Sequence, residues 1–429
     1  MGGLPGCGLL PQAAVPHHAA NVLRLEEGLM SVQRGFWLAV ACGALILTIA
    51  TGLRATFGLF LKPVSLDIGI SREFFGLGFA LQNLLWGLAS PFLGSIADKY
   101  GTGRVVAFGA LCYAAGLAMM GYATSGDVFI LGNLLVGVAL AGAGFSTVLG
   151  AVGRAAPPEK RSVALGIITA GGSFGQFAVV PYAHLLIEAL DWRMALVGLA
   201  LTALIMLPLI PPVTKVKSVL PSGVPQTLRQ AFSEAMVHKG FWLLTAGFFV
   251  CGFQVVFVAT HLPAYLADRG LPTWVGAWTL ALVGLFNIIG SYSCGWLGGR
   301  YAKKDLLALL YALRSLVFIL FMLMPLSEYS VLLFGALLGL LWLGTVPLTS
   351  GLVAYIFGPA YMSMLYGIVF LGHQVGSFLG AWLGGYIYDV FGSYDAMWWI
   401  CVALGFTASL LHFPIAERPV PRLAAAAAR

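Results

Sequence analysis

Twelve long apolar runs constrain the fold of this chain more than any other feature. Each run is long enough to cross a bilayer as a helix, which takes about 20 predominantly apolar residues. Only 9% of the 429 residues are charged, whereas soluble domains carry roughly 25%. We therefore predict an all-α polytopic membrane protein with twelve transmembrane helices. The predicted spans are residues 36–62, 73–97, 104–124, 128–152, 162–187, 192–213, 241–267, 274–298, 305–325, 330–356, 361–388 and 394–415.

The longest polar interval separates the sixth run from the seventh. It extends from Lys215 to Lys239 and contains basic residues and prolines. At this length it is too short to fold independently, so it is unlike the output region of a receptor. We therefore expect a cytoplasmic linker over residues 215–239, between six-helix halves at 35–214 and 240–416.

The two ends of the chain differ from the apolar runs. Residues 1–34 mix apolar and polar residues and contain three prolines, which is typical of neither a signal peptide nor a span. We expect a disordered N-terminal extension there, in which Met30 is an alternative start. Residues 417–429 are expected to form a C-terminal tail.

The basic residues predict the orientation. With the N-terminus inside, the even-numbered connections and both tails hold seventeen Lys and Arg residues, and the odd-numbered connections hold four. This split satisfies the positive-inside rule. We expect both termini in the cytoplasm and a plasma-membrane location, which in a bacterium is the inner membrane. The net charge of +7 is scattered through short loops, a distribution that does not predict nucleic-acid binding.

The sequence carries no pattern typical of an enzyme, a metal site or a cofactor site. There is no CxxC, and five of the six cysteines lie in apolar runs, where small core residues are expected. HExxH is also absent, and the one GxSxG string, at residues 171–175, lies inside an apolar run. We therefore expect no enzyme activity, no metal and no cofactor.

A polar turn between the second and third runs has a partial copy in the second half. The turn is Gly94-Ser95-Ile96-Ala97-Asp98-Lys99-Tyr100-Gly101-Thr102-Gly103-Arg104, and the copy is Gly295-Trp296-Leu297-Gly298-Gly299-Arg300-Tyr301. Two further pairs follow in the same order, Gly35-Phe36-Trp37-Leu38 with Gly240-Phe241-Trp242-Leu243, and Gly172-Ser173-Phe174 with Gly376-Ser377-Phe378. Their near-constant offset indicates parallel halves related by an axis along the bilayer normal.

The sequence resembles the major facilitator superfamily over about residues 35–416. The resemblance is carried by the turn, its copy, the glycine-rich fifth run and the division into two halves. The resemblance implies that the turn helps to lock one conformation. Asp98 would then lie near the N-terminal end of a helix in its own half, and Arg104 would add cytoplasmic charge. Alternatively, the basic residues of the turn only set the topology. The predicted conformational motif comprises Gly94, Asp98, Lys99, Gly101, Arg104 and Arg300.

Ionisable residues inside the predicted spans are functional candidates, because they are costly to bury in a membrane. Arg54, His261, Arg314 and His373 lie in spans, and no Asp or Glu lies mid-span. Such a cationic interior predicts a substrate that carries a carboxylate. The Arg54 guanidinium offers a planar fork to that group, and the resemblance implies that span 1 lines the path. The alternative is that Arg54 extends to the outer interface.

The other candidates complete the predicted site. His373 either binds substrate and couples protons, or stays neutral between helices. His261 is a candidate gate residue, and Arg314 is expected to pack against a carbonyl or a lipid phosphate. Neutral polar residues that could add hydrogen bonds, or join helices, are Asn83, Gln176, Gln254, Asn287 and Gln374.

Within the superfamily, the cationic path resembles the monocarboxylate transporters and the oxalate:formate antiporters. Span 1 ends in Phe60-Leu61-Lys62, similar to a lysine-containing end in the former. Asn287 and Ser291 stand where those carry an Asp and an Arg, which is a departure from the family pattern. We predict a monomeric secondary transporter for a small organic anion, with a monocarboxylate as the leading candidate and proton symport as a subordinate prediction. The alternatives are an exporter of neutral or amphipathic compounds and a non-transporting receptor.

Overall fold

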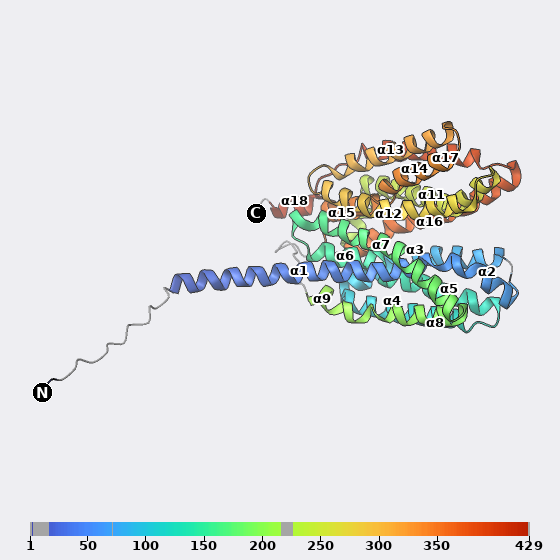
Figure 1. Cartoon of the computed structure of the whole chain (residues 1–429). Coiled ribbons are helices and arrows are strands. Elements are labelled where there is room, and N and C mark those ends of the chain that lie inside the picture. Colours follow the sequence, from blue (N-terminus) through green and yellow to red (C-terminus); the bar gives the residue numbers. More distant parts are fainter. Residues whose placement is uncertain (1, 3–16, 71, 216–225, 428–429) are drawn as a thin grey trace.

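The computed structural model describes residue 2 and residues 17–70, 72–215 and 226–427, and these ranges are helical with no strand (Figure 1). The elements before the linker are α1 (His17–Ala55), α2 (Phe57–Ile68), α3 (Arg72–Tyr100), α4 (Thr102–Gly121), α5 (Gly126–Ala143), α6 (Phe145–Ala155), α7 (Pro158–Ala189), α8 (Trp192–Leu204), the 3-10 helix η1 (Leu207–Leu209) and α9 (Ile210–Lys215). Those that follow are α10 (Leu228–Met236), α11 (Lys239–Asp268), α12 (Thr273–Leu297), α13 (Lys303–Leu323), α14 (Glu328–Leu340), α15 (Thr345–Phe357), α16 (Met362–Phe391), α17 (Asp395–His412) and α18 (Pro421–Ala427).

The predicted membrane-spanning fold is confirmed. Eleven stretches of the described chain are long and apolar enough to cross a membrane. Helix α3, with 29 residues, is not among them, because it carries Gln82, Asn83 and Ser90. All three are buried, since α3 packs between α5 and α16. The second predicted span is therefore less apolar than the others because its polar side chains face protein.

The helices form two groups that repeat the same pairings. In the first group α1 packs on α7, α3 on α5 and α4 on α8; in the second, α11 packs on α16, α12 on α14 and α13 on α17. Figure 1 shows the first group in blue to green and the second in yellow to red. The groups meet along two seams, α3 with α16 and α7 with α12. We call the end of the bundle that holds α9 and α18 the terminal end.

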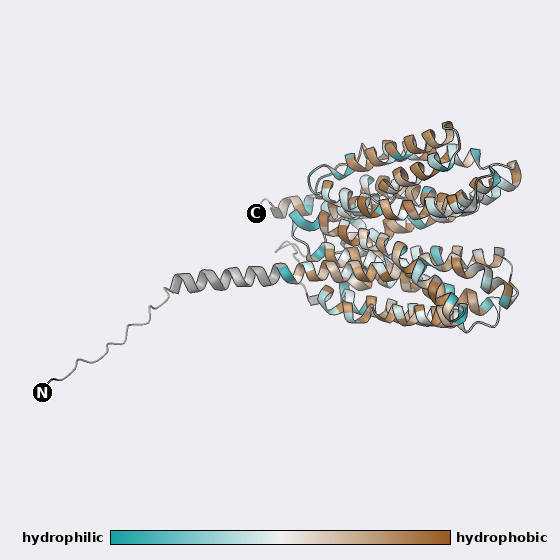
Figure 2. Cartoon of the chain, in the orientation of Figure 1, coloured by the Kyte–Doolittle hydropathy of each residue, from teal (hydrophilic) through white to brown (hydrophobic). Residues whose placement is uncertain are grey.

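Charge gathers at the two ends of the bundle. Apolar residues cover most of its length, and hydrophilic residues lie mainly toward the ends (Figure 2). At the terminal end Asp98 pairs with Arg154, and Glu417 with Lys303. At the opposite end the pairs are Arg193 with Asp67 and Arg269 with Asp395. This distribution is the one that a membrane-spanning bundle requires, because unpaired charge is costly in hydrocarbon.

Three spans that the sequence predicts as continuous are broken in the structure. Span 1 is interrupted at Thr56, span 4 at Gly144, and span 10 between Leu340 and Thr345. The freed carbonyls find partners nearby. The Thr147 hydroxyl donates to the Ala141 carbonyl at 3.0 Å. In the second half, the Arg314 guanidinium donates to the carbonyls at the break of span 10. Breaks at membrane depth are tolerated where such groups are satisfied by protein.

The N-terminal extension differs from the expected disorder. Residues 17–34 continue α1 as helix, and Figure 1 shows this stretch projecting beyond the bundle. The difference arises because Pro16 is the last proline of the segment and good helix formers such as Ala, Leu and Glu follow it. Residues 1 and 3–16 lie outside the described residues.

The linker and the tail also contain helices. Helix α10 begins with a capping box between Thr227 and Gln230, and residues 216–225 lie outside the described residues. Arg422, on α18, pairs with Glu234 of α10 at 3.0 Å and donates to the Phe357 carbonyl at 3.2 Å. The tail therefore connects the linker helix to the end of α15.

Candidate functional site

A chain of hydrogen bonds joins Arg54 to His373 across the two groups of helices. Arg54 Nη2 donates to Asn83 Oδ1 at 2.6 Å, and the Asn83 carbonyl accepts from Gln374 Nε2 at 3.1 Å. Gln374 Oε1 lies 3.0 Å from His373 Nδ1. Four of the predicted site residues therefore lie together, on α1, α3 and α16.

Arg54 occupies the last turn of α1, where a cation is favoured by the helix dipole. Its guanidinium carbon lies 5.0 Å from the ring centroid of Phe79 and 5.4 Å from that of Trp86, both on α3. The side chain therefore faces α3. Among the described side chains no carboxylate pairs with it, and its buried Nε has no hydrogen-bond partner. The guanidinium is a cation held by a neutral amide and two rings.

His373 is held on α16 by neighbours of the same helix. Because Gln374 Nε2 donates to a carbonyl, its Oε1 faces His373 as an acceptor, and this assigns a proton to Nδ1. The ring is nearly parallel to Phe370, with 5.4 Å between centroids, and it is buried.

A second polar bridge crosses the α7–α12 seam. Asn287 Nδ2 donates to the Ser173 hydroxyl at 2.8 Å, and its Oδ1 accepts from Ser291 at 3.1 Å and from the Leu343 amide at 2.9 Å. Asn287 and Ser291, four residues apart, therefore pair on one face of α12. Its place is at the contact between the halves and beside the break of span 10.

The remaining predicted residues lie apart from this chain of hydrogen bonds. Gln254 accepts from Arg314 at 3.1 Å and donates to the Cys401 carbonyl at 2.8 Å, within the second group of helices. His261 Nε2 lies 2.8 Å from the Ala381 carbonyl, toward the opposite end. Gln176 is partly exposed on α7.

Arg314 contacts carbonyls, as expected from its sequence context. It is fully buried and donates to the carbonyls of Leu341 and Trp342, where span 10 breaks. A guanidinium there compensates the negative end of the α14 dipole. Its charge is therefore committed within the second half.

The predicted location of Asp98 was wrong. Its carboxylate accepts from the amides of Ser363 at 3.3 Å and Met364 at 2.8 Å. These amides begin α16, which belongs to the opposite half and not to its own. The reason is that α3 ends against the start of α16, and the free amides of a helix N-terminus attract an anion.

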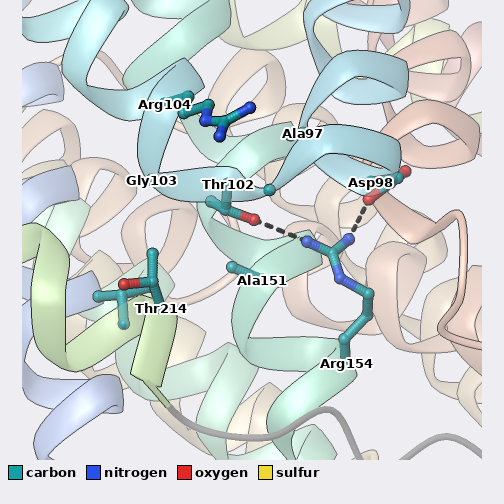
Figure 3. A pocket seen from close by; sticks show the side chains of 10 residues that line it. Ala97, Asp98, Thr102, Gly103, Arg104, Ala151, Arg154 and Thr214 are labelled. Atoms are coloured by element: carbon teal, nitrogen blue, oxygen red, sulfur yellow. Dashed lines mark hydrogen bonds and ion pairs between the residues drawn. The ribbon is translucent and has the colours of Figure 1, made fainter.

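Arg154 completes this contact, although no sequence pattern singled it out. It pairs with Asp98 and donates to Thr102 Oγ1 at 2.7 Å (Figure 3). It also donates to Ser363 Oγ at 3.0 Å. Burial raises the pKa of Asp98, whereas Arg154 and the two amides lower it. The signal that could have identified Arg154 is the need of a buried acid for a basic partner at the same membrane depth.

The other motif residues surround the contact. A Cβ on Gly94 would lie 2.5 Å from the Ser363 carbonyl, so only glycine permits this approach. Gly101 has a φ of 102°, in the left-handed region that favours glycine. Arg104 is exposed beside a cavity of about 460 Å³ that Asp98 and Arg154 also line. Lys99 and Arg300 lie over the rings of Tyr100 and Trp296.

Both seams are built from small residues between the terminal end and mid-bundle. A Cβ on Gly87 would lie 2.6 Å from Gln374 Cβ, and a Cβ on Gly295 would lie 2.5 Å from Gly166 Cα. The polar bridges Asn83–Gln374 and Asn287–Ser173 lie farther from the terminal end on the same helices. Beyond them, a Cβ on Gly284 of α12 would meet no described atom within 4 Å. The halves are thus closed against each other on the terminal side of the polar bridges.

The arrangement defines a twelve-span carrier with a polar centre, and the comparisons agree. The sequence model of the Major Facilitator Superfamily matches residues 40–363. The chain belongs to this family of transporters and is a multi-pass membrane protein. The resemblance stated from the sequence is therefore confirmed.

Relatives in sequence are distant but nearly full-length. The chain is 24% identical to the uncharacterized MFS-type transporter YcxA of Bacillus subtilis, covering 85% of this chain and 91% of the relative. It is 23% identical to the oxalate:formate antiporter of Oxalobacter formigenes (90% and 92% covered). It is 25% identical to monocarboxylate transporter 12 of Rattus norvegicus (77% and 75% covered).

Solved structures agree on the fold. The proton:xylose symporter XylE superimposes with a TM-score of 0.70 at 14% identity, covering 92% of this chain and 99% of that one. The E. coli fucose:proton symporter FucP gives 0.66 at 15% identity, with 87% and 98% covered.

Proposed function

We propose that this chain is a secondary active transporter for small organic anions, with monocarboxylates as the leading class. The observation that carries the proposal is the environment of Arg54. A partly buried guanidinium, with a neutral partner and an Nε that has no hydrogen-bond partner among the described residues, offers charge and donor groups to a carboxylate. Two curated relatives whose names specify oxalate, formate or monocarboxylates support the same class.

The broken spans support an anionic cargo independently. Helix α6 begins at Phe145 and α15 at Thr345, both at the middle of a span and both without a side-chain cap. A half-helix that starts at membrane depth directs the positive end of its dipole into the protein. Trp86 Nε1 lies 3.2 Å from a Cβ placed on Gly144, so the start of α6 is close to the Arg54 neighbourhood.

Alternating access would use the two halves, residues 35–214 and 240–416, as the moving bodies, with 215–239 as their linker. The seams close the terminal side in the present conformation. Opening this side would break the Asp98 contact with α16 and the polar bridges of Asn83 and Asn287. We assign substrate contacts to Arg54, Asn83, His373 and Gln374, and conformational locking to Asp98 and Arg154.

Proton symport is a subordinate part of the proposal. His373 is connected to Arg54 through Gln374 and Asn83, so a change in its charge would be felt at the anion site. Imidazole titrates near neutral pH. Anion-driven pH change inside proteoliposomes tests this part, with protein-free liposomes as the control, and a pH change equal in both would leave uniport or exchange.

The orientation belongs to the proposal as well. With the terminal end in the cytoplasm, the basic residues obey the positive-inside rule, and the location would be the plasma membrane, or the inner membrane of a bacterium. The functional unit would be the monomer, because one chain contains both halves.

The anion proposal is tested by giving Arg54 an internal counter-ion. Asn83→Asp places a carboxylate where the amide oxygen lies 2.6 Å from Nη2, and Arg54→Gln removes the charge. We expect both variants to lose at least about tenfold in affinity for lactate, measured by the ligand-dependent rise in unfolding temperature and by uptake of labelled lactate. Arg193→Gln, which removes a partly exposed arginine at the opposite end, is the control.

Unchanged lactate or acetate affinity in Arg54→Gln, with the protein folded in the membrane, would overturn the proposal. Stabilisation by neutral or cationic compounds, but by no carboxylate, would do the same and would favour the alternative of an exporter of neutral compounds.

A further inference from the structure

The polar groups around the break of span 4 have more hydrogen-bonding capacity than the protein uses. Arg54 Nε, Trp86 Nε1, Ser146 Oγ and both amide atoms of Gln82 are buried without a partner among the described residues. They come from α1, α3 and α6. Gln82 and Trp86 are four residues apart on α3, so they share one helix face. Buried polar groups are normally paired, so a set of orphans at one place points to a ligand.

An aromatic surface adjoins these groups. The Trp86 ring lies 4.8 Å from that of Phe370, and Phe370 is nearly parallel to His373, at 6°. Phe145, at the start of α6, stacks with Trp86 at an interplanar angle of 16°. We call these four residues, Trp86, Phe145, Phe370 and His373, the ring cluster. Two come from each half, so the cluster lies where the halves meet.

Arg54 is at one edge of the ring cluster, because its guanidinium lies 5.4 Å from the Trp86 ring. A carboxylate bound to Arg54 would have the remainder of its molecule against flat aromatic faces and edges. Resting on the proposed anion transport, we infer that the preferred cargo is a monocarboxylate with an aromatic ring, its carboxylate at Arg54 and its ring against Trp86 and Phe370.

The chemistry of the cluster disfavours two other kinds of anion. A second carboxylate would face ring faces, which carry the negative part of the aromatic quadrupole. The buried arginines Arg314 and Arg154 are already committed, Arg314 to carbonyls and Gln254 and Arg154 to Asp98. An acetate-sized anion could pair with Arg54, but it would gain nothing from the rings. An aromatic ring prefers offset or edge-to-face contact with other rings, and this adds to the affinity from apolar burial alone.

The test compares anions that differ by one group. Acetate, cyclohexylacetate, phenylacetate and oxalate are titrated against the purified full-length protein, and apparent Kd values are measured by calorimetry. We expect phenylacetate to bind at least about tenfold more tightly than acetate, a ratio equivalent to one favourable aromatic contact. Cyclohexylacetate, of similar size but without a π-system, should fall between them, and oxalate should bind more weakly than acetate.

A variant and its matched control locate the effect. Phe370→Leu should reduce the ratio of phenylacetate to acetate affinity about tenfold. Phe321→Leu removes an equally buried ring from the separate stack with Phe334 and should leave the ratio unchanged. If Phe370→Leu does not fold, Phe145→Leu serves the same purpose, and the wild-type series decides the question without any variant.

The outcomes separate this inference from the proposed function. Acetate binding as tightly as phenylacetate, or oxalate binding more tightly than either, would overturn the aromatic cargo and leave anion transport intact. If none of the four anions binds to folded protein, both ideas fail.

Discussion

A single methyl group on the α7–α12 seam should change the conformational equilibrium of the protein. A Cβ on Gly295 would lie 2.5 Å from Gly166 Cα and 2.9 Å from the Ser162 carbonyl. Both obstacles are backbone atoms, which cannot move aside as a flexible side chain would. Gly295→Ala therefore pushes α12 away from α7 in the closed arrangement, and not in an arrangement where the seam has opened.

The size of the effect follows from the cost of overpacking, about 1–3 kcal/mol for added methylenes in a well-packed interior. The gain in helix propensity from Gly to Ala is about 0.8–1 kcal/mol, but it applies to both conformations and cancels. The closed state should thus lose about 1–3 kcal/mol relative to the open one. That corresponds to a shift of roughly 5- to 150-fold in the equilibrium constant.

The matched control lies on the same helix. Gly284 has no neighbour within 4 Å of a Cβ, so Gly284→Ala makes the same chemical change without touching the seam. Spin labels at positions 159 and 300, both exposed at the terminal end, would report the separation of α7 and α12 by pulsed EPR, with the native cysteines replaced by alanine. We expect a longer distance to gain population only in Gly295→Ala. Identical distance distributions in the two variants would refute the reasoning.

Two further predictions concern buried arginines and their partners. Asp98→Asn leaves Arg154 without a countercharge, so we expect the closed state to lose about 3 kcal/mol relative to the open state, measured as the same shift in the EPR distances. The control is Asp67→Asn, which breaks a more exposed ion pair at the opposite end and should destabilise the closed state by at most about 1 kcal/mol. Equal effects of the two substitutions would contradict the assigned contact. Arg314→Met leaves the Leu341 and Trp342 carbonyls unsatisfied and should lower the free energy of unfolding by about 2–4 kcal/mol. The measurement is unfolding in detergent, with Arg300→Met as the control. Equal unfolding midpoints for the two variants would contradict the role of Arg314 at these carbonyls.

The fold was predictable because its determinants are local in the sequence. Apolar length marks a span without knowledge of its neighbours, and the repeat of Gly94–Arg104 at Gly295–Tyr301 reveals the two halves. The breaks of spans 4 and 10 were not predicted. Gly144 and Gly344 resemble the many other glycines of the spans, and the breaks depend on partners such as Arg314 that come from other helices.

The candidate site was predictable in its charges but not in its contacts. Arg54 stands out because an arginine in an apolar run is costly. The bond between Asn83 and Gln374 joins residues 291 positions apart, and the contact of Asp98 with Met364 joins residues 266 apart. No periodicity within one half carries such information, and this is why Asp98 was expected to contact its own half. The sequence does not distinguish Trp86 and Phe370 from the other apolar residues of the spans, because only the fold brings their rings together.

In the proposed mechanism, Asn83 couples cargo binding to the opening of the α3–α16 seam. Its side-chain oxygen occupies a donor of Arg54 that a carboxylate would take, while its backbone carbonyl holds Gln374 across the seam. A bound anion that draws the guanidinium away would leave the Asn83 side chain with its hydrogen bond to the Phe79 carbonyl. A ligand shifts a conformational equilibrium only by its difference in affinity for the two states. The proposed anion contacts both halves, Arg54 in the first and the Phe370 ring in the second. Its affinity therefore differs between the two conformations, because both contacts form in only one arrangement of the halves.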